Sequence, residues 1–113
     1  MGILKRILGQ RASTGSSALV GRWCLTSSKG EHLDPAELIM DADGGLTYAV
    51  ESDDRWQIMH LTYRIEGDFL ISDQPSAPRQ ERTRFEVQPY GGLLLDYGAT
   101  QALFHRCAGR APL

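Results

Sequence analysis

Three histidines, His32, His60 and His105, are the side chains whose ordinary pKa lies nearest neutrality, and they are therefore the first candidates for acid–base chemistry or metal binding. Their spacing matches no metal-ligand pattern, and the two cysteines, Cys24 and Cys107, form no Cys-x-x-Cys pair. The sequence accordingly predicts no metal site and no cofactor. It leaves open an enzyme in which His60 and a carboxylate form an acid–base pair, but no motif indicates a reaction class. We therefore expect a non-enzymatic protein.

Residues 31–54 contain eight acidic residues and neither Lys nor Arg. Asp41-Ala42-Asp43-Gly44 resembles the start of a calcium loop, but the position that should hold the terminal Glu is Ser52. An acidic hairpin turn accounts for the segment, because Asp and Gly favour tight turns. The acids also support a second hypothesis, a protein-binding inhibitor, immunity or adaptor module whose acidic loops meet a basic partner.

Several aromatic and cationic side chains belong to the types that bind nucleic acid by base stacking and phosphate neutralisation: Trp56, His60, Tyr63, Arg64, Arg82 and Arg84. Arg82 and Arg84 stand among Glu81 and Glu86, so cross-strand ion pairs explain them more simply. The formal net charge is −2, which gives no overall attraction to phosphates. The sequence predicts no nucleic-acid partner.

The cysteines and the N-terminal segment bear on the cellular compartment. Two cysteines are too few for a disulfide scaffold, and the sequence does not establish whether they meet, so we expect two free thiols in a cytosolic protein. Lys5 and Arg6 interrupt the apolar residues at the N-terminus, which therefore lacks the hydrophobic stretch of a secretory signal. We expect a cytoplasmic location and no stable membrane anchor.

Turn residues divide the chain from about Ala18 onward into short runs rich in β-branched and aromatic residues, which are typical of strands. The predicted strands are 19–26, 37–41, 46–51, 56–65, 69–72, 81–88, 93–97 and 101–107. Most connections have two to five residues, which favours antiparallel neighbours. The predicted fold is all-β: an antiparallel up-and-down meander of about eight strands closed into a small barrel.

The predicted domain organisation is a single barrel with a tail at each end. Residues 1–17 are assigned to an N-terminal tail or linker, either a short amphipathic helix or a flexible segment, residues 18–108 to the barrel, and residues 109–113 to a C-terminal tail. The length of 113 residues fits one domain.

The first predicted strand contains Gly21-Arg22-Trp23, which resembles the opening Gly-x-Trp signature of lipocalin-like calycin domains. The resemblance implies that Trp23 closes the base of the barrel and that a late basic residue, Arg106 or Arg110, packs across it. Stacking of a guanidinium on an indole contributes about 0.5–2 kcal/mol. Gly21, Trp23 and Arg106 are thus the predicted structural residues.

The interior of an eight-stranded barrel is either filled by side chains or holds one small ligand, and the sequence leaves both open. Our leading hypothesis is a lipocalin-like binding domain for a small apolar or amphipathic ligand. Alternation along the strands supplies the candidates for the cavity lining, for instance Leu46, Tyr48 and Val50 on one face of their strand. The predicted ligand-binding residues are Tyr48, Trp56, Ile58, His60, Phe85 and Leu95. The identity of the ligand and the oligomeric state stay open.

Overall fold

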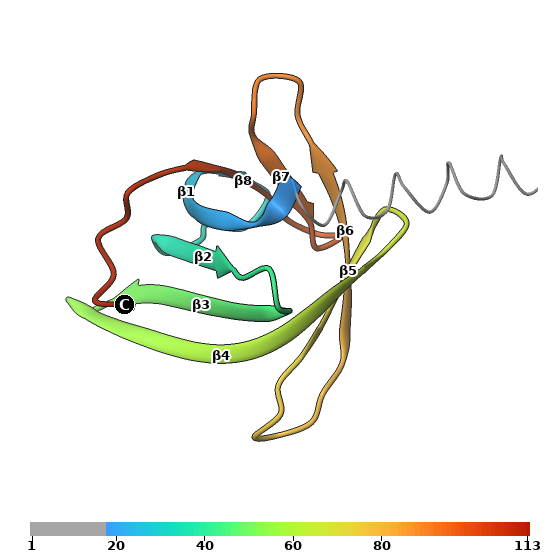
Figure 1. Ribbon diagram of the computed structural model, residues 1–113. Helices are drawn as coiled ribbons and strands as arrows, with labels where there is room; N and C mark the ends of the chain where they lie inside the picture. The colour runs from blue at the N-terminus through green and yellow to red at the C-terminus, as the bar shows by residue number, and fades with distance from the viewer. Residues whose placement is uncertain (1–17) are drawn as a thin grey trace, which may run out of the picture.

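The computed structural model describes residues 18–113, and the tail predicted for residues 1–17 lies outside them. The described residues form eight strands in chain order (Figure 1): β1 (Gly21–Lys29), β2 (Ala36–Met40), β3 (Gly45–Ser52), β4 (Arg55–Glu66), β5 (Phe69–Asp73), β6 (Glu81–Val87), β7 (Leu93–Asp96) and β8 (Gln101–Arg106). Between residues 18 and 113, no helix is long and apolar enough to cross a membrane.

Each strand pairs antiparallel with the next, and β8 pairs with β1 to close the barrel. The predicted all-β meander is therefore confirmed. Short turns make this order possible: Asp53 and Asp54 both adopt a positive φ, of 53° and 62°, in the two-residue turn between β3 and β4. Asp tolerates this left-handed conformation better than most residues. The loop between β5 and β6 and the loop between β6 and β7 project from opposite ends of the barrel (Figure 1).

The core lies inside the barrel, where inward-facing side chains of neighbouring strands meet. Trp23 and Leu38 are cross-strand partners and are 1% and 3% exposed, and Phe104 on β8 is 1% exposed. Since alternate residues of a strand point to opposite faces, one register places a complete row of apolar side chains inside. Burial of this row stabilises the closed sheet by removing apolar surface from water.

One end of the barrel, which we call the base, is closed by Trp23 and Arg106. The Trp23 indole Nε1 donates a hydrogen bond to the carbonyl oxygen of Leu19 at 3.0 Å, and the Arg106 guanidinium carbon lies 4.2 Å from the centre of the Trp23 ring. The guanidinium also donates to the carbonyl oxygens of Ala18 and Val20. Arg106, not Arg110, is therefore the late arginine at Trp23.

Gly21 is required at the base for two reasons. Its φ is +133°, which L side chains rarely adopt, and a Cβ there would collide with the guanidinium of Arg106. The stacked and hydrogen-bonded guanidinium has little freedom to withdraw. The Gly-x-Trp spacing thus places an indole under the arginine and leaves room for that arginine two residues earlier.

The expectation of two free thiols was wrong. Cys24 and Cys107 form a disulfide, with their Cα atoms 5.7 Å apart. Cys24 pairs across the β1–β8 seam with His105, and the backbone N–H of Cys107 donates to the carbonyl oxygen of Arg22 at 3.2 Å. Closure of the barrel brings together two residues that are 83 positions apart in the sequence, and no local pattern encodes that encounter.

Candidate functional site

The barrel contains an open cavity of about 320 Å³ that is lined mainly by leucines. Its lining residues are Leu33, Leu38, Leu46, Tyr48, Leu61, Leu70, Ser72, Glu81, Thr83, Leu95 and Tyr97. Small-molecule sites typically combine an apolar lining with a few polar groups, and begin at about 300 Å³. The cavity is therefore large enough for one small ligand.

The cavity opens at the end of the barrel opposite Trp23, which we call the mouth and define as residues 29–35, 52–55, 73–81 and 96–101. Glu81 and Tyr97 line the cavity and belong to these segments. Two of the segments are joined by a hydrogen bond of 3.2 Å from the backbone N–H of Glu31 to Thr100 Oγ1. Because Trp23 and Arg106 close the base and Glu81 and Tyr97 lie at the mouth, we expect a ligand to enter from the mouth.

Cross-strand register determines which side chains face the cavity. Tyr48 pairs with Met59 and Leu46 pairs with Leu61, so these four side chains share the inner face of β3 and β4. Ser72 pairs with Glu81 in the same way, which turns the Glu81 carboxylate toward the interior rather than toward the outer face of β6.

The six predicted ligand-binding residues occupy three different kinds of position in the barrel. Tyr48 and Leu95 line the cavity. Phe85 pairs with Leu95 on the inner face and packs against the core, but it is not part of the lining. Trp56, Ile58 and His60 pair with Glu51, Ala49 and Thr47, on the outer face.

The assignment of Trp56, Ile58 and His60 to the cavity therefore has to be corrected, and the turn before β4 is the reason. Because Asp53 and Asp54 alone form the turn, Ser52 pairs with Arg55 and Glu51 with Trp56. Trp56 consequently shares the face of Glu51, which is opposite to that of Tyr48. The predicted strands 46–51 and 56–65 already place Glu51 opposite Trp56 across a short turn, so applying that register would have given the correct face from the sequence.

Four polar lining residues were not among the predicted ligand-binding residues: Ser72, Glu81, Thr83 and Tyr97. The sequence offered Glu81 and Glu86 as the acids beside Arg82 and Arg84 for cross-strand ion pairs. Arg82 instead lies 3.5 Å from Glu66, and its guanidinium carbon is 4.0 Å from the centre of the Phe69 ring. Alternation along β6 indicates that Glu81 faces inward, because Glu81, Thr83 and Phe85 are on one face and Arg82 is on the other.

The pKa values of the two tyrosines at the cavity are raised, chiefly by burial. Burial raises the pKa of Tyr97, and the neighbouring Tyr48 and Glu81 raise it further. Burial also raises the pKa of Tyr48, with an additional contribution from Asp34. Both phenols therefore remain protonated at neutral pH and can donate as well as accept hydrogen bonds.

The histidines do not gather at the cavity. His60 is exposed on the outer face of β4, His32 is exposed in the mouth, and His105 Nδ1 lies 2.9 Å from Thr26 Oγ1. The hypothetical acid–base pair of His60 with a carboxylate in the barrel mouth is thus not assembled. The acids of residues 31–54 are also divided, with Asp41 and Asp43 at the base and Asp53 and Asp54 at the mouth.

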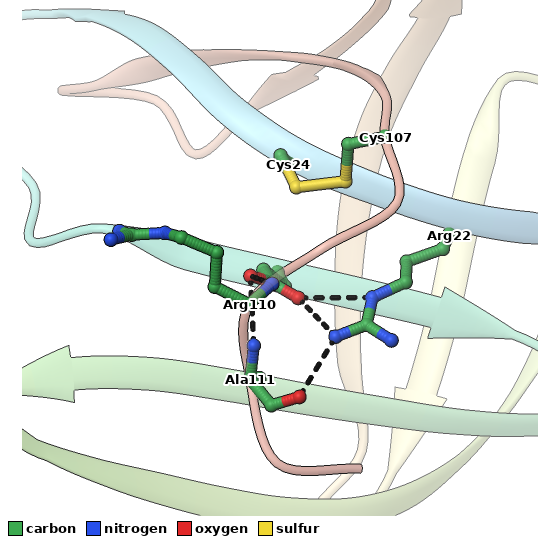
Figure 2. Close-up of polar contacts among 6 residues, drawn as sticks. Arg22, Cys24, Cys107, Arg110 and Ala111 are labelled. Atoms are coloured by element: carbon green, nitrogen blue, oxygen red, sulfur yellow. Dashed lines mark hydrogen bonds and ion pairs between the residues drawn. A yellow bond between two sulfur atoms is a disulfide. The ribbon is translucent and has the colours of Figure 1, made fainter.

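One carboxylate, Glu37, is buried outside the cavity, on the outer face of β2. Figure 2 shows the neighbouring Arg22, Arg110 and Ala111. Its side chain is 4% exposed and accepts hydrogen bonds from Arg22 at 2.7 and 3.0 Å. The backbone N–H groups of Arg110 and Ala111 donate to its other oxygen at 2.7 and 3.2 Å. Burial alone would raise the pKa of Glu37, but these hydrogen bonds outweigh it and hold the pKa below the ordinary 4.5. Glu37 therefore fastens the C-terminal segment to the barrel.

Glu37→Gln is expected to lower the free energy of unfolding by about 1–3 kcal/mol at neutral pH, because it removes a hydrogen-bonded buried charge. A lowered pKa contributes stability that is complete above the ordinary pKa of 4.5 and is lost as the pH falls through the folded-state pKa. Urea unfolding across acidic pH should therefore show the parent losing stability faster than the variant. Glu86→Gln, at an exposed position, serves as the control. An equal gap at every pH would contradict the assignment.

Two further surface hollows are lined largely by polar and charged side chains. One of about 380 Å³ lies over Ser52, Asp53, Arg55 and Gln57, and one of about 250 Å³ lies over residues of β6 and β7 that include Arg84 and Asp96. The first is larger than the barrel cavity, but its lining is a single hairpin turn. Ligand sites are mostly apolar with a few polar groups, so the barrel cavity is the stronger candidate.

Comparison with known proteins identifies the fold. No protein-family model matches the chain, and no curated protein matches it. Among solved structures, the chain is similar to a lipocalin-like protein from Bacteroides uniformis ATCC 8492, with a TM-score of 0.65 and 16% sequence identity over 80% of this chain and 99% of that chain. Together with the eight-stranded closed barrel, this similarity shows that the chain is a lipocalin-like small β-barrel. At this identity, the similarity shows the fold alone.

Proposed function

We propose that this protein binds a small apolar or amphipathic molecule in its barrel cavity. The observation that carries the proposal is the cavity of about 320 Å³, with five leucines from the barrel strands in its lining, a plugged base and an open mouth. Filling such a space with an apolar ligand removes apolar surface from water. A group the size of water occupies about 30 Å³, so the cavity suits a ligand of about ten non-hydrogen atoms.

The test uses 1-octanol, an uncharged ligand of this size, titrated into isotope-labelled protein and followed by the amide NMR signals of the cavity strands. Saturable shifts are expected at Leu46, Leu61 and Leu95. Leu61→Trp places a large ring in the cavity and should weaken binding by at least about tenfold, which corresponds to about 1.4 kcal/mol.

Ile58→Trp is the matched control, because Ile58 lies on the same strand as Leu61 but faces outward. It should bind 1-octanol as tightly as the parent does. If 1-octanol fails to bind the parent, or if both tryptophan variants lose binding equally, the proposed function is wrong. Native mass spectrometry of freshly purified protein would add the mass of any retained ligand.

A further inference from the structure

The charges around the cavity are distributed unevenly. This distribution affects which polar head group of an amphipathic ligand the cavity accepts. Among the lining residues, Glu81 is the one with a formal charge, and no Lys, Arg or His is present. Ser72, Thr83, Tyr48 and Tyr97 supply hydroxyl groups. An anionic head group would thus meet a carboxylate with no cation in the lining to compensate it.

The mouth adds to this negative potential. Its four segments contain seven Asp or Glu residues and three Lys or Arg residues. Positive charge gathers instead on the side of the barrel, where Arg64, Arg82 and Arg84 project from the outer face of β4 and β6. Arg64 and Arg82 both pair with Ile71, and Arg84 pairs with Phe69. Acidic residues therefore outnumber cations at the mouth, and these three arginines lie on the outer face of the barrel.

One cation does lie near Glu81. The Arg79 Nε is 3.6 Å from Glu81 Oε1, but the Arg79 side chain is 81% exposed and the Glu81 side chain is 57% exposed. A pair this accessible is weak, because water screens it and two long side chains must be ordered to form it. The carboxylate can exchange this partner for a ligand cation without leaving a buried charge unpaired.

We propose that the cavity selects amphipathic amines, with the apolar chain among the leucines and the ammonium group at the mouth between the Glu81 carboxylate and the Tyr97 hydroxyl. This inference rests on the proposed function and specifies its ligand class. An ammonium group is charged at neutral pH, attracts the carboxylate and donates three hydrogen bonds. A carboxylate head group on the same chain is repelled by Glu81 and by the acidic mouth.

The experiment compares three ligands that share one alkyl chain and differ in the head group: octylamine, 1-octanol and octanoate, titrated by NMR at neutral pH and low salt. Octylamine should bind at least about tenfold more tightly than octanoate, with 1-octanol between them. Added salt should reduce this difference and leave the affinity for 1-octanol unchanged, because screening acts on the charged ligands.

Two variants locate the effect. Glu81→Gln should weaken octylamine about threefold, strengthen octanoate and leave 1-octanol unchanged, since the carboxylate is half-exposed. Glu86→Gln removes the same charge from the outward face of β6 and should change none of the three affinities. If octanoate binds as tightly as octylamine, or Glu81→Gln acts like Glu86→Gln, the amine inference is wrong and the proposed function stands. If none of the three ligands binds, the proposed function itself fails.

Discussion

Replacing Trp23 with alanine is expected to lower the free energy of unfolding by about 3–5 kcal/mol, the range for truncation of a buried aromatic side chain. Trp23 is 1% exposed and stands among the largest fully buried side chains of the described residues. The substitution removes the indole under Arg106 and the hydrogen bond to Leu19, and it leaves a void at the base. Total stability of a small domain is about 5–15 kcal/mol, so urea unfolding should show a much lower midpoint.

Three further substitutions separate a specific role of Trp23 from a general effect. Trp56→Ala removes the same side chain from the half-buried outer face of β4 and should cost less than half as much. Arg106→Ala should cost about 1–3 kcal/mol through lost stacking and two lost hydrogen bonds. Arg110→Ala should be nearly silent, because its side chain is 74% exposed. A Trp23→Ala protein as stable as the parent would contradict the closed base.

The sequence predicted the strands well because alternation and turn chemistry are local. All eight predicted runs correspond to observed strands, with boundaries that differ by at most three residues. β1 shows the largest difference, since it continues to Lys29 through a bulge between Leu25 and Ser27. A bulge inserts one unpaired residue, Thr26, and interrupts the alternation on which a prediction depends.

The lining of the cavity was predicted less well, because face assignment requires a register as well as a strand. A shift by one residue moves every side chain of a strand to the other face. The residues of β4 illustrate this, since no register was assigned between the predicted strands 46–51 and 56–65, and Trp56, Ile58 and His60 were placed inside instead of Met59 and Leu61. Tyr48 and Leu95 were assigned correctly to the interior, because the inward-facing set of alternate residues was chosen correctly for their strands.

Contacts that form only when the barrel closes could not be predicted from the sequence. Glu37 belongs to a predicted strand, but its partners Arg22 and the backbone of Arg110 are 15 and 73 residues away. Gly109, with a φ of +81°, passes so close to the Arg22 guanidinium that a Cβ there would collide with it. The segment assigned to the C-terminal tail is packed on the outer face of β1 and β2 through Arg22 and Glu37 (Figure 2).

The disulfide beside this segment gives the second large effect. Exchanging both Cys24 and Cys107 for serine is expected to lower the free energy of unfolding by about 4 kcal/mol, because the bond closes a loop that spans most of the chain and restricts the unfolded ensemble. The sequence separation is 83 residues, and loss of loop-closure entropy grows with that length. Urea unfolding of the parent under oxidising and reducing conditions, beside the serine variant, measures the effect.

Reduction of the parent should give the unfolding midpoint of the Cys24→Ser, Cys107→Ser variant, and the reductant should leave the variant itself unchanged. Hydrogen exchange should locate the loss: the amides of Arg110 and Ala111, which donate to Glu37, should exchange faster once the bond is gone, since Cys107 no longer holds the segment in place. A serine variant with the midpoint of the parent would contradict this role. Cytoplasmic location stays a prediction, and thiols are kept reduced in the cytoplasm. Alkylation of the protein from intact cells would show whether Cys24 and Cys107 are bonded or reduced there, and therefore whether the stability of the oxidised or of the reduced protein applies in the cell.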